Sequence, residues 1–253
     1  MRKFLLLLLS VSFIISCNNN KKDDKAGKEN DDTALSNTQN TVSPTTPIPN
    51  PLEKLLGSFV GAFGTNKITM LITKVFGDSV GGRTIVGGND RPFYGTFIKT
   101  GTSFAFSAKE PGDHKDDGEF SFTIDESDPN IISGSWKPNT KDKKEKTYQL
   151  QRKAFEYKTG VGNYPESSQR LLKADDVENL PKRELEFMRN EIFARHGYCF
   201  NRKHLRQQFE MQDWYVPSTV DIKGLLTAVE KKNIEMIKRY EKYAEEYGDE
   251  YGR

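Results

Sequence analysis

Apolar and polar side chains alternate along residues 52–155, and this period of two constrains the fold more than any other feature of the chain. Phe120, Phe122 and Ile124 occupy every second position, and the residues between them are serine and threonine. Successive side chains of a β-strand point to opposite faces, so such a run buries one face and leaves the other in water. Half-buried strands of this kind are typical of antiparallel sheets.

Eight such runs follow one another, and each ends in residues that favour turns. No helical pattern separates them, so consecutive strands are expected to pair as hairpins. Closing an up-and-down sheet into a barrel removes its exposed edges. We therefore predict an antiparallel β-meander closed into a barrel, with an open meander or a sandwich as the alternative; only in architecture does it resemble small lipocalin- or avidin-like barrels. The runs span residues 58–63, 67–76, 79–86, 93–99, 102–109, 119–124, 131–137 and 147–152.

The chain begins with a basic pair, Arg2 and Lys3, followed by an apolar run over residues 4–15. This run is too short to cross a hydrocarbon core of about 30 Å as a helix, and the pattern predicts a signal peptide over residues 1–16. Its end, Ile-Ser-Cys at Cys17, resembles the lipobox of bacterial lipoproteins. The resemblance implies cleavage before this cysteine and acylation of its sulfur; an ordinary secretory signal is the alternative.

Two or more acyl chains on Cys17 would hold the protein on a membrane, because each buried CH₂ contributes about 0.8 kcal/mol. By the sorting rules of such lipoproteins, Asn18 in place of aspartate favours the outer membrane and leaves the periplasmic or surface face open. Residues 17–51 contain few large apolar side chains and many Asn, Lys, Asp, Thr and Pro. We expect a disordered tether with an r.m.s. length of roughly 30 Å.

Charge and cysteine content argue against two classes of protein. The formal net charge is only +2 and no segment is strongly basic, so we expect no nucleic-acid partner. If Cys17 is acylated, Cys199 is alone, and disulfides cannot stabilise the fold. Cys199 stands between Tyr198 and Phe200 and is expected to be a small buried side chain.

Beyond residue 155 the apolar period changes from that of strands to that of helices. Leu185, Met188, Ile192 and Phe193 recur at helical spacing. Gly197 follows this run and is expected to end the helix in the left-handed conformation that glycine adopts without strain.

Two further helices are predicted. Asn201 is a candidate N-cap for a helix that contains Leu205 and Phe209. A last helix is expected to begin at a capping box formed by Thr227 and Glu230, which stand three residues apart.

The segment RNEIFARHGYCF, residues 189–200, closely resembles the motif that names the YARHG domain. The resemblance covers residues 164–245 and leaves a tail at 246–253; Phe193 stands where the motif has tyrosine. The resemblance to the YARHG domain implies a small helical module found in exported or membrane-tethered bacterial envelope proteins. It implies no particular reaction. With the barrel at 52–155, the fold class is α+β in two domains.

The polar residues of this segment allow two interpretations. They could form a satisfied polar network that includes an ion pair between Glu191 and Arg195 and connects the helix to the turn at Asn201 and to the Trp-Tyr corner that follows. They could instead form an exposed patch for an anionic or sugar-rich ligand, because arginine suits carboxylates and phosphates. Residues 182–206 carry 7 basic and 3 acidic groups, which lends some support to the second interpretation, although the network is the preferred one. The candidate binding residues are Arg189, Glu191, Arg195, His196, Trp214 and Tyr215.

The sequence supports catalysis and metal binding less well than it supports a polar network or a ligand-binding patch. The motif offers His196 no serine or threonine nucleophile. His196, Cys199 and His204 supply three possible zinc ligands and no fourth. The acidic loop 113–119 resembles a calcium loop but has Lys115 where an oxygen ligand is required. We therefore expect no catalytic residue, no metal and no cofactor.

These observations predict a lipid-anchored envelope protein with a non-catalytic binding role, whose partner is a peptidoglycan-like component or another envelope protein. The alternative places the function in the barrel, as a periplasmic carrier of a small molecule. That alternative predicts a cavity lined by Phe104, Phe106, Phe120 and Phe122, whereas a packed interior would contradict it.

Overall fold

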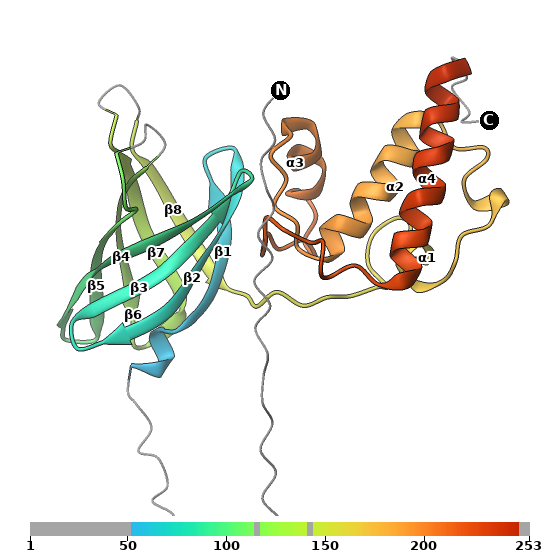
Figure 1. Ribbon diagram of the computed structural model, residues 1–253. Coiled ribbons are helices and arrows are strands. Elements are labelled where there is room, and N and C mark those ends of the chain that lie inside the picture. Colours follow the sequence, from blue (N-terminus) through green and yellow to red (C-terminus); the bar gives the residue numbers. More distant parts are fainter. Residues whose placement is uncertain (1–51, 114–116, 141–143, 248–253) are drawn as a thin grey trace, which may run out of the picture. The chain divides into compact units, whose positions relative to one another are not determined.

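The computed structural model describes residues 52–113, 117–140 and 144–247 (Figure 1). The predicted signal peptide (1–16), Cys17 and the predicted tether (17–51) lie outside the described residues, as does Lys115 of the acidic loop. Within the described ranges, no helix is both long enough and apolar enough to cross a membrane.

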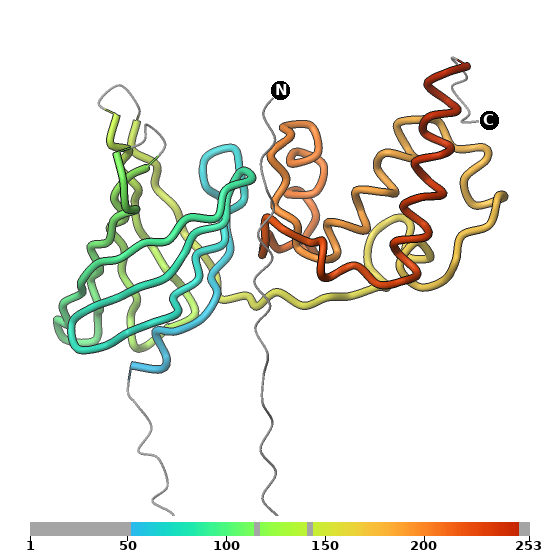
Figure 2. The backbone as a smooth tube through the Cα atoms, viewed as in Figure 1, coloured from blue at the N-terminus to red at the C-terminus, as the bar shows by residue number. Residues whose placement is uncertain are grey.

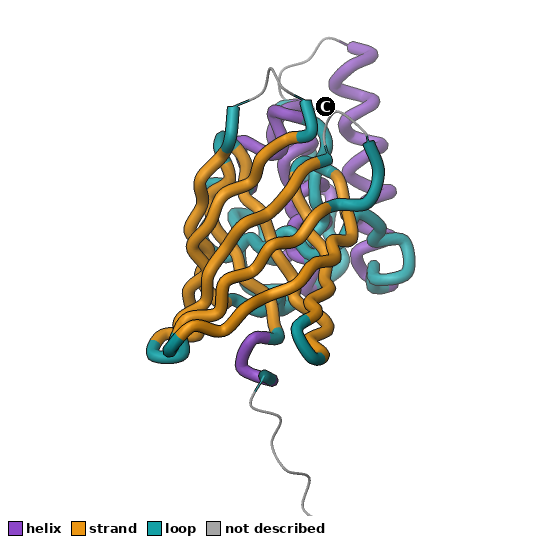
Figure 3. The backbone as a smooth tube through the Cα atoms, turned by 90° about the vertical axis from the view of Figure 1, so that its left-hand side faces the viewer, coloured by secondary structure: helices purple, strands orange, loops and turns teal. Residues whose placement is uncertain are grey.

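The N-terminal part of the described chain is a closed antiparallel barrel in which each strand pairs with the next (Figures 1 and 3). The first and last strands also pair, with Phe59 opposite Arg152. The predicted barrel is confirmed, and the open meander and the sandwich are excluded. The strands are β1 Gly57–Phe63, β2 Asn66–Phe76, β3 Ser79–Val86, β4 Asn89–Thr100, β5 Ser103–Lys109, β6 Gly118–Asp125, β7 Asp128–Pro138 and β8 Lys146–Arg152.

The turn between β3 and β4 is tighter than the sequence predicted. Gly87 and Gly88 both have positive φ angles, of 60° and 86°, as a two-residue hairpin turn of type I′ requires. Asn89 and Asp90 therefore pair with the end of β3 instead of continuing the turn. Strand β4 consequently begins at Asn89 rather than at residue 93.

Aromatic side chains fill most of the barrel interior. Phe106 and Phe122 stack with their ring centroids 4.5 Å apart, and Phe97 packs against Phe106 at 5.2 Å. The short 3₁₀ helix η1, Glu53–Leu55, lies at one end of the barrel, where Leu55 is fully buried against the core (Figure 1). Rings packed in this way leave no room for a ligand between them.

A cavity of about 480 Å³ remains at the opposite end of the barrel. Of the four phenylalanines expected to line a cavity, Phe120 borders it, whereas Phe104, Phe106 and Phe122 belong to the packed core. The alternative of a hollow interior lined by all four is therefore not met, because Phe104 and Phe106 each pack against a ring on a neighbouring strand.

The C-terminal part of the described chain is helical, and its two longest helices pack against each other (Figure 2). Leu185, Met188 and Ile192 of α2 form an apolar core with Ile234 and Ile237 of α4. The predicted helical domain is thus confirmed. Its elements are α1 Glu166–Gln169, η2 Ala174–Asp176, α2 Lys182–Arg195, α3 Lys203–Phe209 and α4 Ala228–Tyr247.

Two of the three predicted helix ends are confirmed. Gly197 follows α2 with a φ angle of 71°. The capping box before α4 is present in both directions, since Thr227 N donates to Glu230 Oε2 at 2.9 Å and Glu230 N donates to Thr227 Oγ1 at 3.1 Å. The predicted cap at Asn201 is wrong: Arg202 occupies the N-cap position of α3, and Asn201 lies one residue too early to bond the first free N–H groups.

Candidate functional site

The side chain of Arg195 is buried at the C-terminal end of α2. Only 1% of this residue is exposed, although arginine is rarely buried without partners. Its guanidinium donates to the carbonyl oxygens of Val161 at 2.8 Å and Tyr164 at 2.7 Å. It also donates to the hydroxyl oxygens of Ser167 at 2.9 Å and Ser168 at 3.0 Å. One charged side chain thus attaches α2 to the segment that precedes and forms α1.

Glu191 supplies the opposite charge one turn earlier on α2. Its carboxylate lies 2.7 Å from the Arg195 guanidinium, so the predicted ion pair is confirmed. It also accepts the backbone N–H groups of Asn163 and Tyr164, each at 2.7 Å. Gly162, with a φ angle of 95°, lets the chain pass over this carboxylate, because a Cβ atom there would collide with the Glu191 oxygens. Burial raises the pKa of Glu191, against the opposing effect of these partners.

His196 connects the end of α2 to the start of α4. Its Nε2 atom lies 2.8 Å from a carboxylate oxygen of Glu230, and its ring stacks on Tyr157 with centroids 4.4 Å apart. Glu230 also accepts hydrogen bonds from the Tyr157 hydroxyl at 3.0 Å and the Ser168 hydroxyl at 2.8 Å. Because the same carboxylate completes the capping box of α4, it joins three separate segments.

The network connects different segments from those expected. We predicted contacts to the turn at Asn201 and to the corner at Trp214 and Tyr215. Tyr215 is instead buried elsewhere and donates its hydroxyl to the Tyr198 carbonyl at 2.8 Å, while Trp214 packs edge-on against Phe209. The reason is that the charged face of α2 packs against the segment before α1, whereas the chain after α2 turns away from this face.

The exposed-patch interpretation required charged side chains that a ligand can reach. Glu191, Arg195 and His196 are at most 5% exposed. Arg189 is half-buried and directs its Nε atom to both carboxylate oxygens of Glu241, at 2.9 and 3.1 Å. These four residues therefore satisfy partners within the domain and do not form a common accessible surface.

Hydrogen bonding determines the charge state of Glu230. Burial by itself raises the pKa of this carboxyl, but the bonds from His196, Thr227 N–H and the Ser168 hydroxyl favour the ionised form and bring the pKa to about 2. The ionised carboxylate is therefore part of the folded domain at neutral pH.

The histidines and the cysteine considered as metal ligands are engaged separately. No group of three metal-ligating side chains occurs in the described ranges. His204 is exposed and lies 3.5 Å from Glu186, while His196 bonds Glu230. Burial raises the pKa of the Cys199 thiol to about 11, so the thiol stays protonated at neutral pH.

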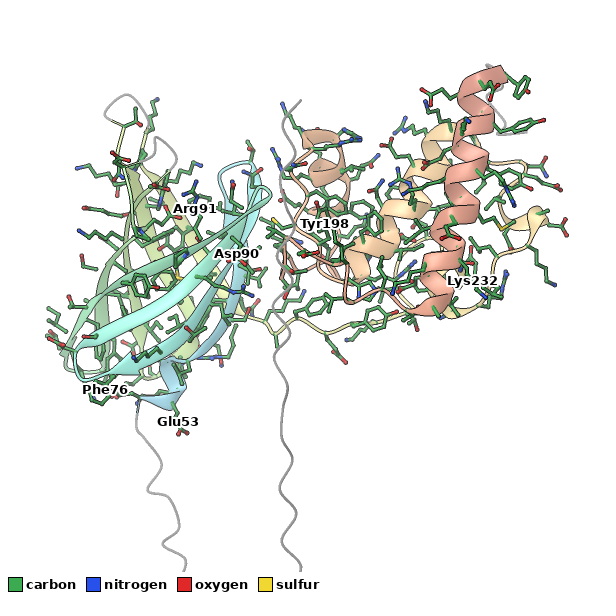
Figure 4. All side chains as sticks on the ribbon, viewed as in Figure 1. Glu53, Phe76, Asp90, Arg91, Tyr198 and Lys232 are labelled. Carbon is green, nitrogen blue, oxygen red and sulfur yellow. The ribbon has the colours of Figure 1, made fainter. Side chains whose placement is uncertain are left out.

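A groove of about 420 Å³ is accessible on the helical domain. Three rings border it, those of Phe193, Tyr198 and the buried Phe200, and the centroids of the first two are 6.3 Å apart (Figure 4 labels Tyr198). Basic side chains outnumber acidic ones along its wall. The residues that give it this character are Arg189, Phe193, Tyr198, Arg202, Asp221 and Lys223.

Sequence reasoning found this groove only in part. Arg189 was a candidate binding residue, but Arg202 and Lys223 come from segments beyond the motif and were missed. Lys223 follows no pattern that predicts its position. The pair Phe193 and Tyr198 could have been found from the sequence, because these two aromatic residues lie on either side of Gly197, where a left-handed turn was predicted.

Replacing Arg195 by lysine is expected to destabilise the helical domain. A lysine ammonium has three donors and cannot reproduce the planar fork of a guanidinium. Buried carbonyl oxygens and the Glu191 carboxylate would lose partners, so we expect the free energy of unfolding to fall by about 3–5 kcal/mol. Urea denaturation followed by circular dichroism measures the change.

The matched control is Arg183→Lys, on the exposed surface of the same helix. Its effect is expected to stay within about 0.5 kcal/mol. An Arg195→Lys variant as stable as the control would contradict the role assigned to the buried guanidinium.

Replacing Glu230 by glutamine is expected to reduce the acid sensitivity of the protein. The pKa of this carboxyl is about 2 in the folded state and near its ordinary 4.5 when unfolded. Its contribution is therefore fully present above pH 4.5 and is lost as the pH falls toward 2. Between pH 5 and pH 2.5, wild type should lose about 1–3 kcal/mol more unfolding free energy than Glu230→Gln. Glu235→Gln, at an exposed position of α4, should behave like wild type.

Comparison with known proteins agrees with this geometry. No curated protein and no solved structure matches the chain. The family model of the YARHG domain matches residues 162–242. This range begins at Gly162 and ends within α4, so it contains the groove and all of the buried network except Tyr157 and Val161. The C-terminal helical part of the chain thus matches the YARHG domain family, as the motif predicted.

Proposed function

We propose that this chain is a lipid-anchored protein of the bacterial cell envelope, whose YARHG domain binds an envelope component without catalysing a reaction. Peptidoglycan is the component that suits the groove best, and another envelope protein is the alternative partner. The observation that carries the proposal is the groove of about 420 Å³ in which aromatic and basic side chains meet.

The groove offers two kinds of contact. The half-buried rings of Phe193 and Tyr198 present apolar faces on which a sugar ring can pack. Arg202, whose side chain is 69% exposed and lies 3.9 Å from Glu186, supplies a fork of donors for a carboxylate. Lys223 adds a second exposed cation. A glycan strand with peptide stems carries sugar rings and carboxylates close together, so it matches both kinds of contact.

The polar groups of the motif support binding rather than catalysis. His196 and Arg195 are engaged inside the domain and do not line the groove. The described residues that do line it include no serine, threonine, cysteine or histidine, and Asp221 is the acid among them. A nucleophile with an adjacent base is the arrangement that covalent catalysis requires.

The proposed cellular location rests on the N-terminal sequence. Acylation of Cys17 would place the protein on a membrane, and Asn18 favours the outer membrane. The tether of residues 18–51 would extend roughly 30 Å on average and about 115 Å when stretched. That range lets the folded domains reach a cell wall next to the membrane.

Replacing Arg202 and Lys223 together by glutamine is expected to weaken binding to cell wall. Both side chains are exposed, so the fold should be unaffected. In a pull-down with purified peptidoglycan at low salt, we expect wild type to be retained and the bound fraction of the double variant to fall at least fivefold.

The matched control neutralises two exposed lysines of α4, Lys231 and Lys232, which do not line the groove. It removes the same charge and should be retained like wild type. An equal loss of bound fraction in both double variants would show that binding depends on the net charge of the protein and not on the groove. No retention of wild type would remove peptidoglycan as the partner.

Replacing Cys17 by serine is expected to abolish lipid attachment. Labelling cells with radioactive palmitate should mark the wild-type protein and leave the variant unlabelled, and the variant should move from the membrane fraction to the soluble fraction. Cys199→Ser is the control that keeps the label, because it retains Cys17 and removes only a buried thiol. Palmitate on the Cys17→Ser protein would refute the anchor.

A further inference from the structure

The open end of the barrel holds a cavity of about 480 Å³ that the proposed function does not use. Residues at the strand ends and turns line much of it, among them Arg91, which Figure 4 labels. A cavity of this size takes a small organic molecule. Its chemistry differs from that of the apolar barrel core, because a buried carboxylate lies in it.

Glu110 is this carboxylate, and it is only 6% exposed. One oxygen accepts the backbone N–H of Gly118 at 3.0 Å and the indole N–H of Trp136 at 3.3 Å. The other accepts the hydroxyl of Thr84 at 3.4 Å. In the described part of the chain, every group that bonds this carboxylate is neutral. Burial raises the pKa of Glu110, as expected for a carboxylate without a bonded cation.

One cation of the cavity, Arg91, already has an acidic partner. Arg91 lies 2.5 Å from Asp117, whose carboxylate is almost completely buried. Arg91 is not among the described groups that bond Glu110, although its charge lowers the pKa of that carboxyl. The negative charge of Glu110 therefore has no bonded counterpart among the described residues, which is costly for a group at this depth.

The wall above Glu110 is aromatic. Phe63, Phe120 and Trp136 border the cavity, and the rings of Phe63 and Trp136 meet edge to face at 5.7 Å. The ammonium of Lys146 lies 4.5 Å from the Phe63 centroid and 5.2 Å from the Trp136 centroid. These faces already hold an ammonium group by cation–π attraction.

We propose that this cavity binds an organic ammonium compound, with the ammonium directed to Glu110 and the apolar body packed against Phe63, Phe120 and Trp136. The ligand would supply the charge that Glu110 lacks and would use the aromatic faces that accept the Lys146 ammonium. An organic anion is the competing occupant, because Lys144 and Lys146 stand at the rim.

Two probes of matched size and opposite charge test the proposal. Calorimetric titration of the full chain with 2-(2-naphthyl)ethylammonium and with 2-naphthylacetate compares a cation and an anion on the same aromatic body. We expect the ammonium to bind at least tenfold more tightly than the carboxylate. The indole N–H signal of Trp136, assigned with a Trp214→Phe variant, should shift as the ammonium binds, because this group bonds Glu110.

The variant Glu110→Gln keeps an amide oxygen that can accept from Gly118 and Trp136, and its NH₂ group can donate to the Thr84 hydroxyl oxygen, but it removes the charge. It should weaken ammonium binding at least tenfold and leave binding of the carboxylate unchanged or tighter. Glu119→Gln is the matched control, one residue beyond Gly118 and exposed on the outside of the barrel. It should bind both probes like wild type.

Three results would overturn the proposal. The first is binding of the carboxylate as tightly as the ammonium, and the second is no binding of the ammonium at millimolar concentration. The third is a folded Glu110→Gln variant that binds the ammonium like wild type. If this variant does not fold, the comparison of the two probes on wild-type protein still decides the question.

Discussion

A guanidinium that has left water needs an acceptor for each of its donors, and the helical domain is organised around one that finds them. The donors of Arg195 meet two carbonyls, two hydroxyls and one carboxylate, all within 3.0 Å. These bonds hold the segment around the short helix α1 against α2. The segment in turn contributes Ser168 to the shell of Glu230, so the same interaction also helps to order the start of α4.

This arrangement divides the motif into two parts with different tasks. Arg195 and His196 point into the domain, and Gly197 provides the left-handed turn that ends α2. Phe193 and Tyr198, on either side of these residues, border the groove. The replacement of the motif's tyrosine by Phe193 therefore changes the groove wall by one hydroxyl and leaves the buried network intact. The most polar residues of the motif thus serve folding, and its rings are what a ligand can reach.

The barrel could be predicted from the sequence because its rules are local. Alternation defines the inward face, and a pair such as Gly87 and Gly88 marks a hairpin turn. The capping box at Glu230 and the ion pair of Glu191 with Arg195 also depend only on short spacings. The remaining partners of Arg195 could not be predicted, since two are backbone carbonyls, which every residue has, and two are serine hydroxyls that lie 27 and 28 residues away in the sequence. Glu110 stands beside a turn signal, and its inward orientation follows only from barrel closure.

The buried carboxylates of this chain differ in what balances them. Glu191 bonds Arg195, and Glu230 bonds His196, so in the helical domain each buried acid has a basic partner in the fold. Asp117 in the barrel follows the same rule through Arg91. Among the described residues, only neutral donors bond the oxygens of Glu110, which therefore departs from this rule. A buried charge that the fold leaves without a partner lowers stability. Glu110 lies in a cavity open to solvent rather than in the packed core, so a cation from outside can reach it and supply the missing charge.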